Sequence, residues 1–161
     1  MTVKSRDISA LKERILKVAR GKIHSEALTP QVEIESHLEL GEITRRLIDE
    51  ISILEPFGQG NPLPVFSLRA AFLKGISPIG AQKNHLKLVV GNSTQSVDGV
   101  AWSMADRLEE FSVGAEHDFA FHLELDQWNG RNVPRMEIVD FRVSDLAQGA
   151  GTDPVQLDLC V

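Results

Sequence analysis

Apolar side chains recur every three or four positions in two segments of the first third of the chain, residues 8–22 and 42–54. This spacing predicts two amphipathic helices, the first with Asp7 as its N-cap. Between them, apolar and polar residues alternate over 32–36, which predicts a short strand. The first third is therefore expected to form a helix–strand–helix segment that is too small to hold a hydrophobic core by itself.

From Phe66 onward the pattern changes to a period of two, which places alternate side chains on opposite faces of a strand. A helical pattern interrupts this series once, at 104–111. The turn at 127–132 contains an Asn-Gly pair, which favours a tight hairpin. Strands are predicted at 66–76, 85–90, 96–102, 118–125 and 135–143.

Five strands with one helix between the third and the fourth is the order of the OB-fold, a small Greek-key barrel, and other small barrels and α+β folds share this order. The predicted fold class is mostly β: a five-stranded OB-like Greek-key barrel preceded by an α+β helix–strand–helix appendage. The aromatic residues of this region are expected mostly in the core: Phe66, Phe72, Trp102, Phe119, Phe121 and Phe141.

Composition limits the class of protein. The chain has 161 residues, 42% of them hydrophobic, which is enough for one domain with a packed core. No apolar run approaches the ~20 residues of a membrane helix, and the first residues lack the apolar stretch of a signal peptide. The single cysteine, Cys160, allows no disulfide or cysteine zinc site within one chain. We expect a cytoplasmic protein with no membrane partner.

The net charge is −6, and residues 143–161 carry half of it, with three acidic residues and no Lys or Arg. A nucleic-acid-binding protein usually carries a basic surplus. Any nucleic-acid binding by this chain must therefore depend on a local patch.

No motif in the sequence indicates catalysis. The five histidines are not spaced as metal ligands, and the nucleophile-elbow and phosphate-loop patterns are absent. The glycines of FGQGNP are followed by proline rather than by a helix that could bind phosphate. We predict no catalytic and no metal-ligating residue.

Binding is the better prospect. An OB barrel holds its ligands on the face of strands 2 and 3 and in the loops between strands 1 and 2 and strands 4 and 5. Cations and aromatic side chains at these places could contact phosphates and stack on the bases of a single strand. The predicted nucleic-acid-binding residues are Lys83, His85, Lys87, Trp128, Arg131 and Arg135.

The two parts of the chain are joined by LEPFGQGNPLPVF, residues 54–66. Its prolines restrict φ, and its glycines allow turns that other residues resist. The Asn61 side chain can bond the backbone of the turn, and Phe57 and Phe66 can anchor the two ends in apolar surface. We predict a rigid joint rather than a flexible linker.

This stretch also resembles the LEPFGxGNPxPxF signature of RecJ, the single-stranded-DNA-specific exonuclease family. Three later stretches resemble motifs of the same family in the same order: HLKLVV, DGVAW and DFAFHLELDQWNGRNVPRMEIVDFR. The resemblance covers about residues 8–143.

The resemblance implies a function in a larger enzyme. RecJ enzymes degrade single-stranded DNA from the 5′ end in repair and recombination, and an upstream DHH domain holds their Mn²⁺ or Mg²⁺. This sequence contains no DHH motif, so the chain is expected to be inactive alone and to have no cofactor of its own. Its first residues, MTVKS, resemble the sequence that follows a Gly-Gly-His element in the DHH-associated domain of the family. This resemblance suggests that the chain is a C-terminal piece of such an enzyme.

The implied organisation has four segments: 1–54, the end of a DHH-associated domain; 55–65, the rigid linker; 66–143, the OB domain; and 144–161, an acidic and flexible tail. The expected function is a non-catalytic module that binds and positions single-stranded DNA for the missing DHH catalytic domain. The alternative is a protein-interaction module that docks a partner such as single-stranded-DNA-binding protein and has little DNA affinity of its own.

Overall fold

The computed structural model describes residues 4–23, 31–127 and 132–144, and the backbone of 157–158. The chain divides into two compact units, residues 1–31 with 156–161 and residues 32–155. Each unit is described by itself below.

The first unit contains the helix that the sequence predicts. A 3-10 turn, η1 (Ser5–Asp7), leads into α1 (Ile8–Lys22). Asp7 stands at the N-cap position, but its side chain makes no capping hydrogen bond. The helix buries none of its residues, and the apolar side chains of its predicted inner face are largely exposed. Strand β1 (Gln31–Val32) pairs with β8 (Leu157–Asp158) in a two-stranded sheet.

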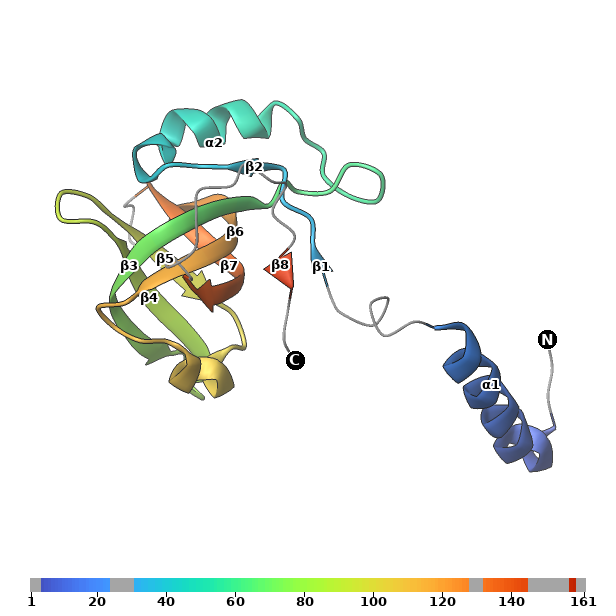
Figure 1. Ribbon diagram of the computed structural model, residues 1–161. Coiled ribbons are helices and arrows are strands. Elements are labelled where there is room, and N and C mark those ends of the chain that lie inside the picture. Colours follow the sequence, from blue (N-terminus) through green and yellow to red (C-terminus); the bar gives the residue numbers. More distant parts are fainter. Residues whose placement is uncertain (1–3, 24–30, 128–131, 145–156, 159–161) are drawn as a thin grey trace. The chain divides into compact units, whose positions relative to one another are not determined.

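The second unit is a closed five-stranded barrel (Figure 1). Strands run in the spatial order β3-β4-β5-β7-β6, and β6 pairs with β3 to close the circle. All neighbouring pairs are antiparallel except β5 and β7, which are parallel. This is the predicted OB-fold, with a 3-10 helix between its third and fourth strands. Its elements are β3 (Phe66–Ile79), β4 (His85–Gly91), β5 (Ser96–Ala101), η4 (Ala105–Glu110), β6 (Glu116–Asp126) and β7 (Val133–Val143).

The barrel interior is filled by the inward positions of its strands. The alternation along β4 places Leu86, Leu88 and Val90 inside, and all three are fully buried. On β6, Phe119 and Phe121 are fully buried as predicted, and they are the largest of the fully buried side chains. This alternation leaves the other faces of β4, β5 and β7 free to present polar side chains outward.

A bulge in β3 changes which of its side chains point inward. The register between β3 and β6 shifts between Leu68 and Ala71, and Ala70 has a positive φ of 50°. One extra residue reverses the alternation. Phe66 and Leu68 are therefore buried before the bulge, whereas Phe72 after it is 43% exposed. The prediction that Phe72 belongs to the core is wrong for this reason.

Residues 32–65 pack on the barrel. Strand β2 (Ser36–His37) runs parallel to the start of β3, and helix α2 (Arg45–Ser52) lies beside β6 and β7 (Figure 1). A 3-10 turn, η3 (Leu40–Glu42), precedes α2, and the Thr44 side chain accepts a hydrogen bond from the Leu47 N–H at 3.3 Å.

This cap starts α2 three residues later than the sequence pattern predicts, and the helix also ends two residues earlier. The predicted strand over 32–36 is only partly present, because residues 33–35 are not in a strand. The buried contact of α2 is made by Ile51, with Leu47 and Ile48 packed against the core. The assignment of residues 1–54 to a DHH-associated domain remains a prediction.

The 54–66 stretch is held by internal hydrogen bonds. The Asn61 side-chain amide donates to the carbonyl oxygens of Leu54 at 2.9 Å and Pro56 at 3.0 Å. The backbones of Gly58 and Asn61 bond each other in both directions, and Gly60 adopts a φ of +92° that few other residues accept. Phe57 packs against the core at one end, and Phe66 is buried at the other. The bonds of Asn61 and the anchoring of both ends are as predicted.

Candidate nucleic-acid interface

A cavity of about 500 Å³ lies on the outer face of the barrel, where β4, β5 and β7 run side by side. These are the second, third and fifth strands of the OB-fold. The end of β3 and the end of β6 complete its walls. The lining residues that bear on its chemistry are Lys87, Asp98, Val100, Trp102, Asp126 and Arg135.

A row of alternating charge crosses this face. Asp98 on β5 is opposite Arg135 on β7, and Arg135 is opposite Glu124 on β6. Arg135 Nη2 lies 2.6 Å from Glu124 Oε1, and its Nε donates to the same oxygen at 2.8 Å. Its Nη1 donates to Asp126 Oδ1 at 3.3 Å. Lys87 on β4 completes the row, with its Nζ 3.0 Å from Asp98 Oδ2.

The sequence predicted Lys87 and Arg135 as binding residues but not the carboxylates that pair with them. Both cations line the cavity, and each is held by at least one carboxylate. Their role in binding stays a prediction. With Asp98, Glu124 and Asp126 against Lys87 and Arg135, this group of five carries a net negative charge at neutral pH. The sequence does contain a signal for two of them: Glu124 and Asp126 lie two and four positions after His122, and alternation along β6 places all three side chains on its polar face.

Trp102 is the aromatic residue of the cavity. It follows β5 directly, and it is 44% exposed, so the prediction that it lies in the core is wrong. Trp102 lies two and four positions after Val100 and Asp98, which face outward from β5, so alternation places its side chain on the same outer face. His85 supports it: the two rings meet edge to face, with centroids 4.9 Å apart at 81°. The His85 Nδ1 accepts a hydrogen bond from the Ser103 N–H at 2.9 Å, which fixes the imidazole.

The other predicted site residues are not brought into this cavity by the described structure. Lys83 is exposed in the loop between β3 and β4, with a positive φ of 54° and its N–H bonded to Gly80 O at 3.1 Å. Trp128 and Arg131 lie outside the described residues. Of the predicted residues, Lys87 and Arg135 therefore line the same cavity, and His85 contacts the ring of Trp102, which also lines it.

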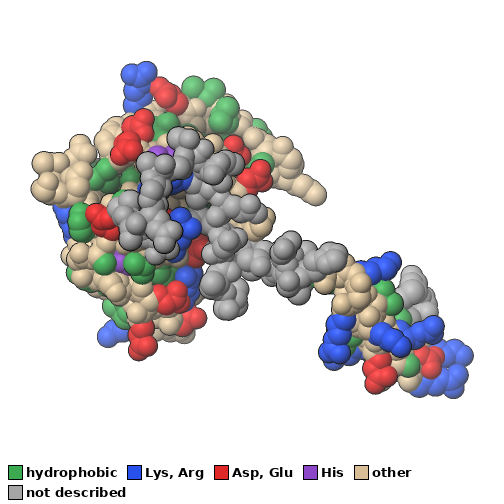
Figure 2. All heavy atoms as spheres, in the orientation of Figure 1, with side chains coloured by type: hydrophobic (Ala, Val, Ile, Leu, Met, Phe, Trp, Pro, Cys, Tyr) green, Lys and Arg blue, Asp and Glu red, His purple; other side chains and the backbone are tan. Residues whose placement is uncertain are grey.

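Positive charge is concentrated elsewhere in the chain. Residues 4–22 contain seven Lys and Arg and two Asp and Glu, whereas the whole chain has a net charge of −6. These side chains are exposed on and around α1, where Figure 2 shows blue side chains gathered. The candidate face of the barrel is thus not the electropositive part of this protein.

Within the described residues, no group of three or more His, Cys, Asp or Glu side chains is placed to hold a metal ion. Among the same residues, no helix has the length and apolar character needed to cross a membrane.

A family model described as the RecJ OB domain matches residues 34–140. The chain belongs to the RecJ OB-domain family. Over 145 residues this RecJ OB chain is 29% identical to the single-stranded-DNA-specific exonuclease RecJ of Bacillus subtilis (strain 168). The matched part is 90% of this chain and 18% of the Bacillus protein.

Two solved structures share the fold of the RecJ OB chain. RecJ of Thermus thermophilus in complex with Mn²⁺ has a TM-score of 0.69 at 22% identity, covering 88% of this chain and 20% of that one. The same protein in complex with Mg²⁺ has a TM-score of 0.67 at 25% identity, covering 88% and 21%. The chain therefore spans about a fifth of the length of the RecJ proteins that it matches.

Proposed function

We propose that this chain is the OB module of a RecJ-like single-stranded-DNA-specific exonuclease, and that it binds the DNA strand in the cavity on β4, β5 and β7. The observation that carries the proposal is the position of the exposed Trp102. It lies on the face where OB barrels hold oligonucleotides, in a domain of the RecJ family. The Bacillus subtilis relative is named for its action on single-stranded DNA.

The cavity has the chemistry for stacking. The Trp102 ring is exposed on one side and supported by His85 on another, so a base can contact it without a rearrangement of the barrel. Ile79, Val100 and Leu125 add apolar walls. Stacking of a base on an aromatic side chain contributes about 1–3 kcal/mol and is tolerant of sequence.

Hydrolysis is assigned to another part of the enzyme. In this proposal a DHH catalytic domain holds the Mn²⁺ or Mg²⁺, and the barrel positions the strand that the catalytic domain cuts. The setting is DNA repair and recombination in the cytoplasm. Incubation of the pure chain with a labelled single strand and Mn²⁺ is expected to leave the strand intact, and degradation by the wild-type chain would contradict a non-catalytic role.

Binding of a labelled thymidine oligonucleotide at about 50 mM salt, measured by fluorescence anisotropy, tests the proposed site. Trp102→Ala should weaken binding about fivefold or more, which corresponds to ~1 kcal/mol. Phe72→Ala is the matched control, because Phe72 is equally exposed, at 43% against 44%, but belongs to no part of the cavity lining. Absence of binding by the wild-type chain, or equal affinity of wild type and Trp102→Ala, would rule out this site.

The alternative function, docking of a protein partner, is favoured by a different observation. Ile53 is 80% exposed and Leu54 is 59% exposed, at consecutive positions directly after α2. A net charge of −6 also disfavours nucleic acid. A pull-down of single-stranded-DNA-binding protein with the immobilised chain tests this function. If the wild-type chain binds that protein but no oligonucleotide at low salt, and the double variant Ile53→Ser with Leu54→Ser no longer binds the protein, the docking function replaces the DNA-binding one.

A further inference from the structure

The two cations of the cavity are already neutralised by neighbours on the same face. Arg135 is 20% exposed and shares its three nitrogens between Glu124 and Asp126. Lys87 is held by Asp98 at 3.0 Å. Charge-assisted pairs of a guanidinium with carboxylates at these distances are among the stronger polar contacts in proteins.

A phosphate that approached Arg135 would have to displace a carboxylate or share the cation with it. Asp98 and Glu124 flank Arg135 in the row, and Asp126 contacts the same guanidinium, so the incoming charge would meet like charges on both sides of Arg135. Such repulsion is only partly screened where the groups are half-buried. The cavity is therefore poorly suited to follow a phosphate backbone.

The rest of the cavity is suited to bases. Trp102 offers an aromatic face, and Val100 and Leu125 offer apolar contact with no charge to satisfy. The half-buried carboxylates are acceptors, which the N–H groups of bases, including the N3–H of thymine, can approach and phosphates cannot. Recognition through bases would also separate single strands from duplexes, in which the bases are stacked inside.

We propose that Asp98, Glu124 and Asp126 act as specificity-determining residues: by holding Lys87 and Arg135 in ion pairs, they keep phosphates out of the cavity and make it bind the bases of a single strand. This inference rests on the proposed function of the same face. It predicts that the carboxylates lower the affinity of the chain for DNA and that their removal frees cations for phosphate.

The test compares the full chain with Asp98→Asn and Glu124→Gln in binding a thymidine oligonucleotide over a range of salt concentrations. Each substitution should tighten binding several-fold at low salt and steepen the plot of log affinity against log salt by up to about 1, the slope expected for one newly available phosphate contact. Glu50→Gln is the matched control. It removes one carboxylate from an ion pair with Arg46 on α2, outside the cavity, and should leave the slope unchanged.

A second measurement uses an abasic oligonucleotide, which keeps the phosphates and lacks the bases. The wild-type chain should bind it much more weakly than the thymidine strand, and Asp98→Asn should recover part of the lost affinity. Because the Asp98 side chain is 30% exposed and does not belong to the core cluster, its substitution is expected to fold normally, and a thermal melt checks this.

The outcomes separate the two proposals. If wild type and variants all fail to bind either strand, the proposed function fails. If the wild type binds the thymidine strand and loses affinity with Trp102→Ala, but Asp98→Asn and Glu124→Gln leave affinity and salt slope unchanged or weaken binding, the inference about the carboxylates is overturned while the proposed function stands.

Discussion

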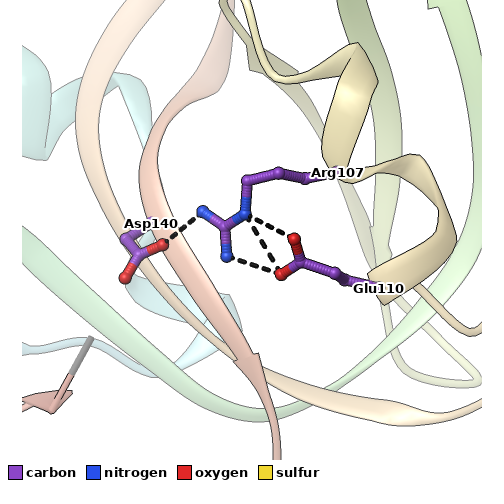
Figure 3. Close-up of polar contacts among 3 residues, drawn as sticks. All are labelled: Arg107, Glu110 and Asp140. Atoms are coloured by element: carbon purple, nitrogen blue, oxygen red, sulfur yellow. Dashed lines mark hydrogen bonds and ion pairs between the residues drawn. The ribbon is translucent and has the colours of Figure 1, made fainter. Parts of the chain in front are cut away.

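The Arg107 guanidinium on η4 donates a hydrogen bond from Nη1 to Asp140 Oδ1 on β7 at 2.8 Å, and so ties the connection between the third and fourth strands to the fifth (Figure 3). The same guanidinium binds both oxygens of Glu110 and lies 4.3 Å from the centroid of the Phe141 ring. Asp140 is 7% exposed, so Arg107 is the cation that compensates a buried carboxylate. The short helix is held on the barrel by charge as well as by apolar contact.

Arg107→Met should therefore lower the free energy of unfolding, because it leaves Asp140 buried without a counter-charge. Loss of one partner from a fully buried pair costs ~3–5 kcal/mol, and the 29% exposure of Arg107 reduces the expected loss to about 2 kcal/mol. Urea unfolding of the second unit measures it. Arg46→Met removes a cation from an exposed pair with Glu50 and should change stability by less than ~0.5 kcal/mol. Equal losses in the two variants would contradict the role given to Asp140.

Acid sensitivity of the Arg107 contact follows from its second carboxylate. The hydrogen bond from Arg107 lowers the pKa of Glu110 below its ordinary value of 4.5. A carboxyl group with a lowered folded-state pKa stabilises the fold above the unfolded value and loses that contribution as pH falls through the folded value. As pH falls below about 4.5, the melting temperature of Glu110→Gln should therefore decrease less than that of the wild type. Thermal melting between about pH 5 and pH 3 measures this difference. An unchanged profile would show that this pair is fully screened by solvent.

His117 is expected to make stability depend on pH near neutrality. Its ring is fully buried beside Phe111, Phe119 and Phe141. Burial lowers the pKa of His117 below 6.5, and the Ala115 carbonyl and Asp118 oppose this only in part. The buried site favours the neutral imidazole, so the contribution of His117 to the free energy of unfolding is fully present above about pH 6.5. That contribution is lost as pH falls through the folded-state pKa, by at most about 1.4 kcal/mol per pH unit.

Urea unfolding at about pH 7.5 and about pH 5.5 measures this loss, and His117→Gln should remove much of it. His37→Gln is the control, because the His37 side chain is far more exposed. A His117→Gln variant that retains the full pH dependence would assign the effect to other groups.

Gly91, where β4 turns toward β5, has no room for a side chain. A Cβ added there would lie 2.2 Å from the Gln95 carbonyl oxygen and 2.8 Å from the Ser96 Cα, both of which are backbone atoms. Gly91→Ala should therefore destabilise the barrel by about 1–3 kcal/mol or more, through displacement of the hairpin. At Gly75, on the neighbouring strand, an added Cβ meets nothing within 4 Å, and Gly75→Ala should be neutral or slightly stabilising. A chemical denaturation series of the two variants compares them directly.

Trp128 and Arg131, in the loop between the fourth and fifth strands, stay a prediction. If this loop grips DNA, Trp128→Ala with Arg131→Ala should lower affinity by more than ~1 kcal/mol without unfolding the barrel. Anisotropy with the same thymidine oligonucleotide, alongside Trp102→Ala, ranks the loop against the cavity. Unchanged affinity in the double variant would confine the interface to the strand face.

The sequence pattern was a good guide where one strand decides the outcome by itself. Alternation along β4 and β6 identified Leu86, Leu88, Phe119 and Phe121 as buried, because the face on which a side chain lies depends only on the local period. The same reasoning failed for Phe72. The bulge near Ala70 depends on how β3 meets β6, a strand far along the chain, and this pairing reverses the parity of the strand.

The candidate site shows the same division. Lys87 and Arg135 could be placed on the outer face from parity and loop position, and both line the cavity. Parity also places Glu124 on the polar face of β6, but it does not show which cation it meets. Asp98 and Glu124 reach Lys87 and Arg135 across strand pairs whose register is set by the closure of the barrel. Trp102 had the correct parity for exposure, but the helical turn that follows it suggested a cover that the structure does not provide.

The amino-acid sequence by itself determined the succession of strands and helix along the chain, the hydrogen-bonded joint at 54–66 and the RecJ resemblance, since each depends on patterns within short stretches of the chain. Only the tertiary structure decided which charges meet on the outer face of β4, β5, β7 and β6. Coulombic pairing depends on distances between strands, and these are determined by barrel closure rather than by any local pattern. The result is a face in which Lys87 and Arg135 are held by carboxylates, beside a tryptophan that is 44% exposed.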